Sequence, residues 1–345
     1  MFPLAFPLKI LSRAAKNDLV LDPFCGRGTT NYAARLLGLD SVGVDSSPVA
    51  AAITAAKLVG PLPSTIVAEA SDILAKKAPC DVPRGDFWDW AFHAETLLDL
   101  CKFRAALLED CTTSARIALR GIILGALHGP RQKTAPSYFS NQSPRTYAPK
   151  PAYAVRFWRD RELEPPRVEL LDVIRRRAGR YYSAGPQPLG IARLGDSRTP
   201  VMVAAPSSRF SWVVTSPPYY GMRTYLPDQW LRNWFLGGPP EVDYGTLGQV
   251  SHKGPDIFAS DLRKVWKNGR AASADGARLV IRFGGIADRS ANPHEIIMLS
   301  LAETGWRTQT VKPAGSASDG KRQANSFLRN RSEPIEEFVV WARAA

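Results

Sequence analysis

The sequence predicts an α/β protein with a doubly wound, mostly parallel sheet of the Rossmann-like type and a large inserted region of helices and loops. Short apolar strands alternate with helices in the first 60 residues, which is the pattern of a parallel sheet covered by helices. A glycine-containing turn joins the first strand to the first helix. The alternation stops near residue 60 and resumes near residue 190, so one α/β domain is expected from residues 1–60 and 190–345.

Two strand–helix units account for the N-terminal part. The first strand is apolar and stops at Pro23. The second helix has Ser47 as its N-cap and Pro48 at its first helical position, both of which are favoured there. In order, the expected elements are strand 18–23, turn 24–30, helix 31–37, strand 41–45 and helix 49–58.

An insertion of residues 61–189 interrupts this pattern. It begins with amphipathic helical segments, expected over 87–109 and 113–127, and becomes rich in Pro, Arg and Tyr from residue 128 onward. The α/β pattern then resumes with strands 191–196, 211–215, 277–283 and 337–341 and a helix over 293–303.

Composition narrows the class of protein. Among 345 residues, 45 Lys and Arg against 32 Asp and Glu give a net charge of +13 and a pI near 9.8. Such an excess is common in proteins that bind a polyanion, and an ordinary basic protein is the alternative. No apolar run reaches the ~18 residues of a membrane span, the N-terminus lacks signal-peptide features, and four Cys are too few for a disulfide framework. We therefore expect a reduced, cytosolic protein without a membrane partner.

The turn that contains Gly26 and Gly28 predicts a ligand site. Backbone N–H groups at the start of a helix donate hydrogen bonds to an anionic or carboxylate-bearing ligand. Asp45 ends the next strand, where an acid in a doubly wound sheet hydrogen-bonds a ribose. A dinucleotide site requires a third glycine where this sequence has Asn31, so a nucleoside ligand without a pyrophosphate fits better than NAD. A purely structural turn is the alternative.

A second turn follows the strand 211–215. In Thr215-Ser216-Pro217-Pro218-Tyr219 the prolines remove two backbone donors and fix two φ angles, which leaves carbonyls and the Ser216 hydroxyl as rigid acceptors beside an aromatic ring. This arrangement suits a planar base that carries an exocyclic amine. A proline turn packed under an aromatic ring is the alternative.

Residues 22–30 and 215–219 together closely resemble the S-adenosylmethionine-dependent DNA amino-methyltransferases, which make N4-methylcytosine or N6-methyladenine. The resemblance covers roughly residues 3–58 and 190–345. It implies a class I methyltransferase domain with S-adenosylmethionine as cofactor, and it leaves 61–189 as the candidate target-recognition region. The cofactor-binding residues that it implies are Asp22, Pro23, Phe24, Gly26, Gly28, Thr29, Asp45, Ser46 and Asp196, with Asp72 a rival to Asp196 beside the adenine.

The resemblance also implies the catalytic residues, which are Ser216, Pro217, Pro218 and Tyr219. The Ser216 hydroxyl and the Pro217 carbonyl would hold the amine hydrogens and direct the nitrogen lone pair at the methyl group. A base inside a duplex cannot reach such a pocket, so base flipping is implied, with Tyr219 stacking on the extruded base. In this family Ser before Pro-Pro-Tyr accompanies cytosine more often than adenine, which favours N4-methylcytosine.

The basic part of the insertion is the candidate DNA-binding region, because cations there alternate with aromatic rings and amides. A solvated basic face is the alternative. The residues assigned to DNA contact are Arg131, Lys133, Arg145, Lys150, Arg175, Arg176, Arg177 and Arg180. The histidines show no metal-ligand spacing, so no metal is inferred.

The sequence thus predicts a site-specific DNA methyltransferase, with cytosine N4 favoured over adenine N6. Transfer to an RNA base is one rival, because the same side chains contact RNA. A non-enzymatic nucleic-acid-binding module and a nicotinamide-dependent oxidoreductase are rivals of other classes. The sequence specifies neither a partner nuclease nor an oligomeric state.

Overall fold

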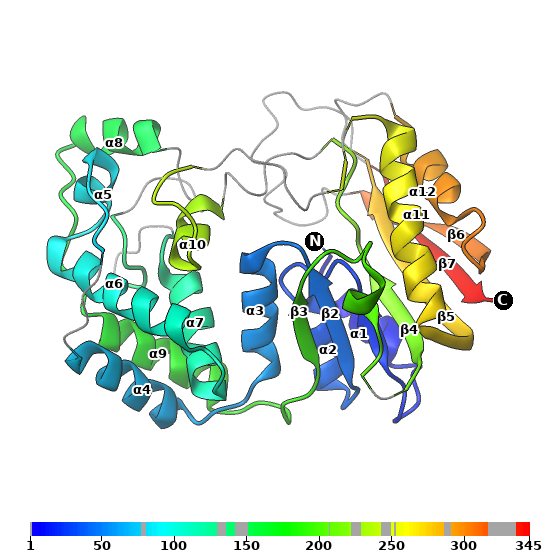
Figure 1. The fold of residues 1–345 in the computed structure, drawn as a ribbon, viewed down its shortest axis with the longest axis horizontal. Coiled ribbons are helices and arrows are strands. Elements are labelled where there is room, and N and C mark those ends of the chain that lie inside the picture. Colours follow the sequence, from blue (N-terminus) through cyan, green and yellow to red (C-terminus); the bar gives the residue numbers. More distant parts are fainter. Residues whose placement is uncertain are drawn as a thin grey trace. The chain divides into compact units, whose positions relative to one another are not determined.

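The computed structural model describes residues 2–76, 81–129, 136–141, 151–206, 208–221, 229–242, 250–251, 253–285, 291–316 and 336–345. The chain divides into two compact units (Figure 1). The sheet unit comprises residues 1–54, 189–223 and 247–345, and the helical unit comprises residues 55–188 and 224–246. No helix in the described ranges is both long and apolar enough to cross a membrane.

The sheet unit is built on one seven-stranded sheet with the order β3-β2-β1-β4-β5-β7-β6. Strands β1 to β5 are parallel, whereas β7 runs antiparallel to both β5 and β6. This order confirms the predicted doubly wound, mostly parallel sheet. The strands are β1 (Val20–Asp22), β2 (Ser41–Asp45), β3 (Ile191–Leu194), β4 (Phe210–Thr215), β5 (Ser273–Gly284), β6 (Trp306–Ser316) and β7 (Glu336–Ala344).

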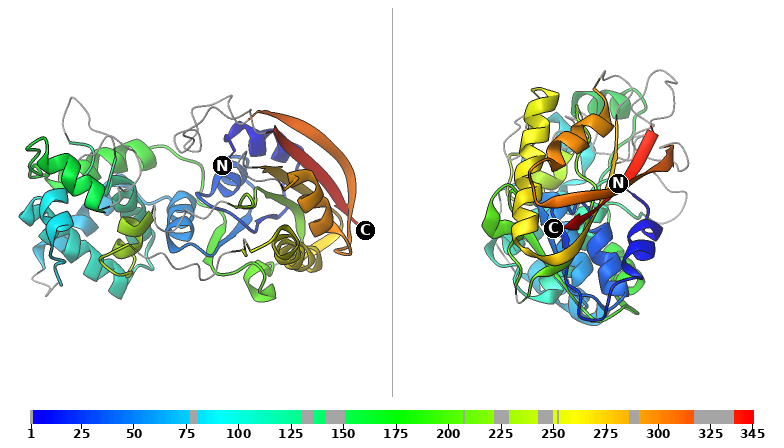
Figure 2. Two further views of the ribbon diagram at one scale, coloured as in Figure 1. Left: turned by 90° about the horizontal axis from the view of Figure 1, so that it is seen from above. Right: turned by 90° about the vertical axis from the view of Figure 1, so that its right-hand side faces the viewer.

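Helices cover both faces of this sheet, and Figure 2 shows α1 and α11 on opposite sides. Consecutive strand residues point to opposite faces, so Leu21 joins the apolar cluster that contains Trp266 of α11, whereas Val20 joins the cluster that contains Ile10 of α1. The helices that begin in this unit are α1 (Ala5–Leu11), α2 (Thr29–Leu36), α3 (Pro48–Leu58), α11 (Pro255–Ala271) and α12 (Pro293–Leu301), with a short 3-10 helix at Pro200–Val203.

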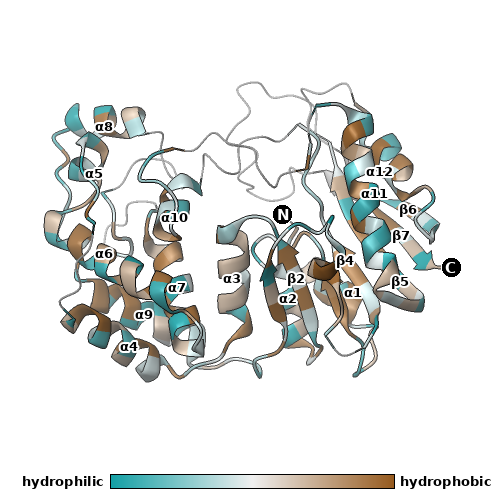
Figure 3. Cartoon of the chain, in the orientation of Figure 1, coloured by the Kyte–Doolittle hydropathy of each residue, from teal (hydrophilic) through white to brown (hydrophobic). Residues whose placement is uncertain are grey.

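The apolar stretches of the central strands β2 and β4 are coloured brown in Figure 3. β1 is fully buried, and it lies between β2 and β4. The chain winds in one direction from β1 through β2 to β3 and then crosses to β4 on the other side of β1. In such a sheet the ligand site lies at the carboxyl ends of the strands where the order reverses.

The helical unit has an aromatic core. Trp88 lies 4.6 Å from Trp234 and 5.8 Å from Trp230, measured between ring centroids, and both partners are buried on α10. Residues 229–242, which follow the second turn in sequence, therefore pack with the insertion. The helices are α4 (Pro63–Ala75), α5 (Asp86–Ala91), α6 (Ala94–Glu109), α7 (Ser114–Ala126), α8 (Pro151–Arg159), α9 (Leu170–Tyr182) and α10 (Trp230–Phe235).

The helix predicted over 87–109 is two helices. Phe92 has extended backbone angles, and His93 caps α6 by accepting a hydrogen bond from the Glu95 N–H on its ring nitrogen. A side chain that caps a helix competes with continuation of the preceding one. The hydrophobic pattern runs through this break because both helices bury their apolar faces.

Candidate active site at the carboxyl edge of the sheet

The first glycine turn requires its glycines. Gly26 and Gly28 have positive φ angles of 53° and 69°, and Gly28 is the N-cap of α2. A Cβ atom on Gly28 would lie 2.8 Å from the side chain of Thr54. The turn is therefore specified both by backbone conformation and by close packing against α3.

Asp45 organises this turn from the end of β2. One carboxylate oxygen accepts a hydrogen bond from the Gly26 N–H and the other from the Ser47 N–H, both at 2.9 Å. Burial raises the pKa of Asp45, and these two N–H groups offset part of that effect. Each oxygen keeps a second lone pair, so the carboxylate can hold the turn and still accept from the hydroxyl groups of a ligand.

The ends of β1, β2 and β3 are joined by hydrogen bonds. The Gly195 N–H donates to the Asp45 carbonyl at 2.9 Å, and the Ser197 hydroxyl donates to the Pro23 carbonyl at 2.6 Å. Of the predicted cofactor-binding residues, Asp22, Asp45 and Asp196 therefore lie at one edge of the sheet, as do the residues that follow them. These followers are Pro23, Phe24, Gly26, Gly28 and Thr29 after β1, and Ser46 after β2.

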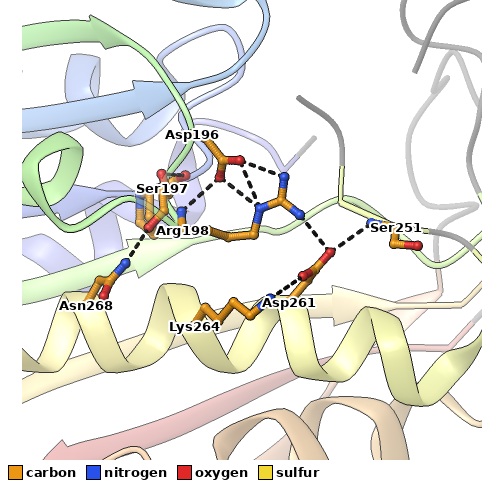
Figure 4. A network of polar contacts seen from close by, with 8 residues as sticks. Asp196, Ser197, Arg198, Ser251, Asp261, Lys264 and Asn268 are labelled. Atoms are coloured by element: carbon orange, nitrogen blue, oxygen red, sulfur yellow. Dashed lines mark hydrogen bonds and ion pairs between the residues drawn. The ribbon is translucent and has the colours of Figure 1, made fainter. Parts of the chain in front are cut away.

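Asp196 belongs to a network of charged groups (Figure 4). The Arg198 guanidinium donates to both of its carboxylate oxygens and also reaches Asp261 of α11 at 2.8 Å. Burial alone would raise the pKa of Asp196, but the hydrogen bonds and charge of Arg198 hold it below its usual range. Asp72, the rival position, is exposed on α4 of the helical unit.

A buried contact joins the two sequence motifs. The Thr215 hydroxyl, at the end of β4, donates to the Asp22 carboxylate at 2.6 Å, and the Phe24 N–H donates to the same oxygen at 3.1 Å. Thr30 of α2 donates to the Val214 carbonyl at 3.2 Å. The glycine turn and the Ser-Pro-Pro-Tyr turn are thus held together where the strand order reverses.

Asp22 is an unusual carboxyl group because it is 2% exposed. Desolvation raises its pKa to about 6, in spite of hydrogen bonds from the Thr215 hydroxyl and the Phe24 N–H that favour the ionised form. The nearby negative charge of Asp45 adds to the increase. The group therefore titrates close to neutral pH.

This titration predicts a pH-dependent contribution to stability. The pKa of Asp22 is higher in the folded chain, about 6, than in an unfolded one, about 3.9. Its contribution is therefore fully present below the unfolded pKa and is lost as the pH rises through about 6. Between pH 5 and pH 7.5 we expect the free energy of unfolding of the wild type to fall by about 1 kcal/mol relative to that of Asp22→Asn. Urea titrations at both pH values measure this, and a difference that does not change with pH would contradict the assignment.

The Ser-Pro-Pro-Tyr turn extends from the end of β4. Pro217 is buried, whereas Ser216 and Pro218 are half-buried. The half-buried Tyr219 donates its hydroxyl hydrogen to the Glu337 carboxylate at 2.9 Å. The four predicted catalytic residues therefore lie beside the predicted cofactor turn in the same unit.

The sequence analysis assigned no role to three residues that lie within or beside these motifs. Thr215 supports Asp22, Glu337 of β7 accepts from Tyr219, and Arg282 of β5 pairs with Glu337. The signal for Thr215 is its place before Ser216. The signal for Arg282 is a charge between apolar residues of a strand, and the signal for Glu337 is a charge directly before the apolar run 338–341. Both side chains are buried in the fold.

Cys25 is not a nucleophile in this arrangement. It is buried within the glycine turn, and burial together with the negative charges of Asp45 and Asp22 raises the pKa of its thiol well above the ordinary value. A protonated thiol is a weak nucleophile. Among the described residues, no group of His, Cys, Asp and Glu is arranged to hold a metal ion.

Four of the predicted DNA-binding arginines lie on α9 of the helical unit. Arg175, Arg176 and Arg180 are exposed. Arg177 is half-buried, donates to the Ser137 carbonyl at 2.7 Å and lies over the Tyr138 ring. Arg177 thus also supports the loop before α8. The other four predicted contacts, Arg131, Lys133, Arg145 and Lys150, lie outside the described residues.

Comparison with known proteins gives a match to a family model and a match to a methyltransferase sequence. Residues 2–56 match the model of the N6/N4 methyltransferase family, described as DNA methylase. A stretch of 35 residues is 49% identical to the Type II methyltransferase M.BsoBI of Geobacillus stearothermophilus, and it covers 10% of this chain and 7% of that protein. These matches support a DNA amino-methyltransferase family.

Solved structures give weaker likenesses. The rRNA methyltransferase aviRa of Streptomyces viridochromogenes is 15% identical, with a TM-score of 0.37 over 100% of this chain and 86% of that chain. A SAM-dependent methyltransferase from Methanosarcina mazei is 9% identical, with a TM-score of 0.37 over 100% and 98% of the two chains. The fold assignment rests on the order and direction of the strands, because these superpositions have low TM-scores and low sequence identities.

Proposed function

We propose that this protein is an S-adenosylmethionine-dependent methyltransferase that acts on the exocyclic amine of a base in DNA, with cytosine N4 as the target. The observation that carries the proposal is the 2.6 Å hydrogen bond between Thr215 and Asp22. It links a turn suited to a nucleoside with a turn suited to a planar amine-bearing base, at the edge where doubly wound sheets bind ligands. The family match to residues 2–56 supports this assignment.

The cofactor site is formed by the ends of β1, β2 and β3. The free lone pairs of Asp45 accept from the ribose hydroxyls, and the buried carboxyl of Asp22 lies close to the methionine part. Asp196 follows β3 at this edge, which supports it over Asp72 as the residue beside the adenine. When bound, S-adenosylmethionine supplies a methyl group activated by its sulfonium charge.

The target base is held by the Ser-Pro-Pro-Tyr turn. Ser216 Oγ and the Pro217 carbonyl accept the two amine hydrogens, which disfavours conjugation of the nitrogen with the ring and directs its lone pair at the methyl group. S-adenosylmethionine bound beside this turn would supply the methyl group for the new N–C bond and leave as the neutral thioether, and the methylated amine would release one proton to water. Tyr219 stacks on the extruded base.

Two assays separate this function from its rivals. Equilibrium dialysis with S-adenosylmethionine and with NAD measures which cofactor binds, and we expect retention of the former alone. Transfer of a labelled methyl group is then compared on mixed-sequence DNA and on RNA, with DNA expected as acceptor. Transfer to RNA alone would mean that the substrate is RNA and not DNA. Binding of the cofactor or of DNA without any methyl transfer would support a non-enzymatic module.

The helical unit is the candidate target-recognition region, and its exposed arginines are the testable part. Replacing Arg175, Arg176 and Arg180 by Gln is expected to weaken binding to all DNA sequences alike. The slope of log affinity against log salt should flatten by up to ~0.9 for each phosphate that the variant no longer neutralises. Fluorescence anisotropy over a salt series measures both effects.

The matched control is Arg167→Gln. Arg167 is an exposed arginine of the same unit that pairs with Glu95 and Glu169. If the α9 variant binds DNA with the affinity and salt slope of this control, α9 presents only a solvated basic face.

A further inference from the structure

Two opposite charges are buried on adjacent antiparallel strands of the sheet unit. Arg282 of β5 is 8% exposed and Glu337 of β7 is 2% exposed. The guanidinium contacts one carboxylate oxygen, Oε2, through Nε at 2.7 Å and through its terminal nitrogen at 2.5 Å. The register places Arg282 opposite Val339 and Glu337 opposite Gly284, so the pair lies diagonally across the two strands.

The second carboxylate oxygen of Glu337 contacts the Ser-Pro-Pro-Tyr turn. Glu337 Oε1 accepts the hydroxyl hydrogen of Tyr219 at 2.9 Å. The Tyr219 ring also packs edge-to-face with Phe283, at a centroid distance of 5.7 Å and an interplanar angle of 84°. Tyr219 is thus fixed at its hydroxyl by β7 and along its ring by β5.

The other side of Arg282 is enclosed as well. Its guanidinium carbon lies 5.2 Å from the centroid of the Phe6 ring of α1. Arg282, Glu337 and Tyr219 therefore form a continuous chain of contacts from α1 to the Ser-Pro-Pro-Tyr turn. Every member of the chain belongs to the sheet unit.

Stability does not account for this ion pair. Burying two charges requires their desolvation, and well-packed apolar residues in place of a buried pair are often at least as stable. Arg282 lies between the buried apolar residues Ile281 and Phe283, and Glu337 directly precedes the buried Phe338. A carboxylate at Glu337 does supply one thing that an apolar residue cannot, which is a strong, directional acceptor for a phenol.

We propose that Glu337 and Arg282 are positioning residues that fix the orientation of the Tyr219 ring for stacking on the target base. This inference rests on the proposed function of Tyr219. Glu337 acts directly on the Tyr219 hydroxyl, and Arg282 acts through Glu337 by compensating its charge and holding the carboxylate in place. The arrangement makes the hydroxyl of Tyr219 matter as well as its ring.

A double-mutant cycle tests this coupling. Tyr219→Phe keeps the ring and removes the tether, which is the hydrogen bond from the Tyr219 hydroxyl to Glu337. Glu337→Gln weakens the acceptor of that bond. Each is expected to lower kcat for methyl transfer to saturating DNA roughly tenfold, with the Kd for S-adenosylmethionine changed less than twofold. The double variant should be no slower than the slower single variant, because both changes break the same contact.

The control is Asp275→Asn, on the strand that also carries Arg282. Asp275 lies on β5 with its side chain 92% exposed, and it pairs with Arg270. This variant also exchanges a carboxylate for an amide and is expected to leave kcat unchanged. If the effects of Tyr219→Phe and Glu337→Gln multiply in the double variant, the two residues act separately and the proposal fails.

A spectroscopic readout keeps the test independent of activity. In protein labelled with 13C at tyrosine Cζ, the resonance that disappears in Tyr219→Phe is the Tyr219 signal. Glu337→Gln is expected to shift that signal, because its hydrogen-bond acceptor changes. Arg282→Met combined with Glu337→Met removes both charges and the acceptor, and it should shift the signal further while retaining cooperative unfolding.

The outcomes separate the two proposals. A shifted resonance in a protein without methyl transfer would contradict the proposed function while the tether stands. An unshifted resonance, or a lowered melting temperature with unchanged kcat, would overturn the positioning role.

Discussion

Replacing Ser216 by Ala is expected to lower the rate of methyl transfer about 100-fold, because a preorganised polar group that contacts the reacting atom contributes about that much. Ser216 is half-buried at the end of β4 and follows Thr215, which is bonded to Asp22. Removing its hydroxyl takes away one of the two acceptors that we propose for the amine and leaves the cofactor turn intact. Single-turnover transfer at saturating DNA measures the effect, with cofactor affinity expected to change less than twofold.

The control for this variant is Ser211→Ala. Ser211 lies near the beginning of β4, the strand that Ser216 follows. It should transfer methyl groups at the wild-type rate. If Ser216→Ala is as fast as Ser211→Ala, the hydroxyl does not hold the amine, and the Pro217 carbonyl alone would have to do so.

Replacing Asp45 by Ala is expected to weaken cofactor binding by about 1.5–3 kcal/mol, the range for removing a charged acceptor from buried hydrogen bonds. That corresponds to an increase in Kd of about 10- to 150-fold. The variant lacks the carboxylate that we propose accepts from the ribose hydroxyls. It also leaves the Gly26 N–H without its acceptor, because that group donates to the Asp45 carboxylate at 2.9 Å. Calorimetric titration with S-adenosylmethionine measures the change.

Asp40→Ala is the matched control, because Asp40 is an exposed acid immediately before the amino end of β2. It should bind the cofactor with wild-type affinity. An unchanged Kd for Asp45→Ala would remove Asp45 from the cofactor site.

The parallel part of the fold was predictable because its signals are local. Strand 41–45 and the helix after Ser47 are present as predicted. Each is specified by residues within it or directly next to its ends. β6 was missed because its residues from Arg307 to Val311 are exposed at the edge of the sheet and show no apolar alternation. α11 was missed although Phe258, Leu262 and Val265 do form a buried helical stripe.

The candidate site was predictable as far as strand ends can indicate it. Parallel strands place their carboxyl ends at one edge of a sheet, and Asp22, Asp45 and Thr215 each end such a strand. The contact between Tyr219 and Glu337 joins residues 118 positions apart through an antiparallel strand, and no sequence periodicity encodes such a pair. The pairing of Asp196 with Arg198 depends on the loop conformation after β3, which spacing alone does not specify.

The most direct test of amino-methyl transfer is mass spectrometry of nucleosides from DNA incubated with the enzyme and isotopically labelled S-adenosylmethionine. We predict labelled N4-methylcytosine with the wild type and at most trace amounts with Ser216→Ala. N6-methyladenine as the sole product would contradict the cytosine assignment and leave amine methylation intact. A labelled C5-methylcytosine, or no labelled base in the presence of bound cofactor, would contradict the central claim.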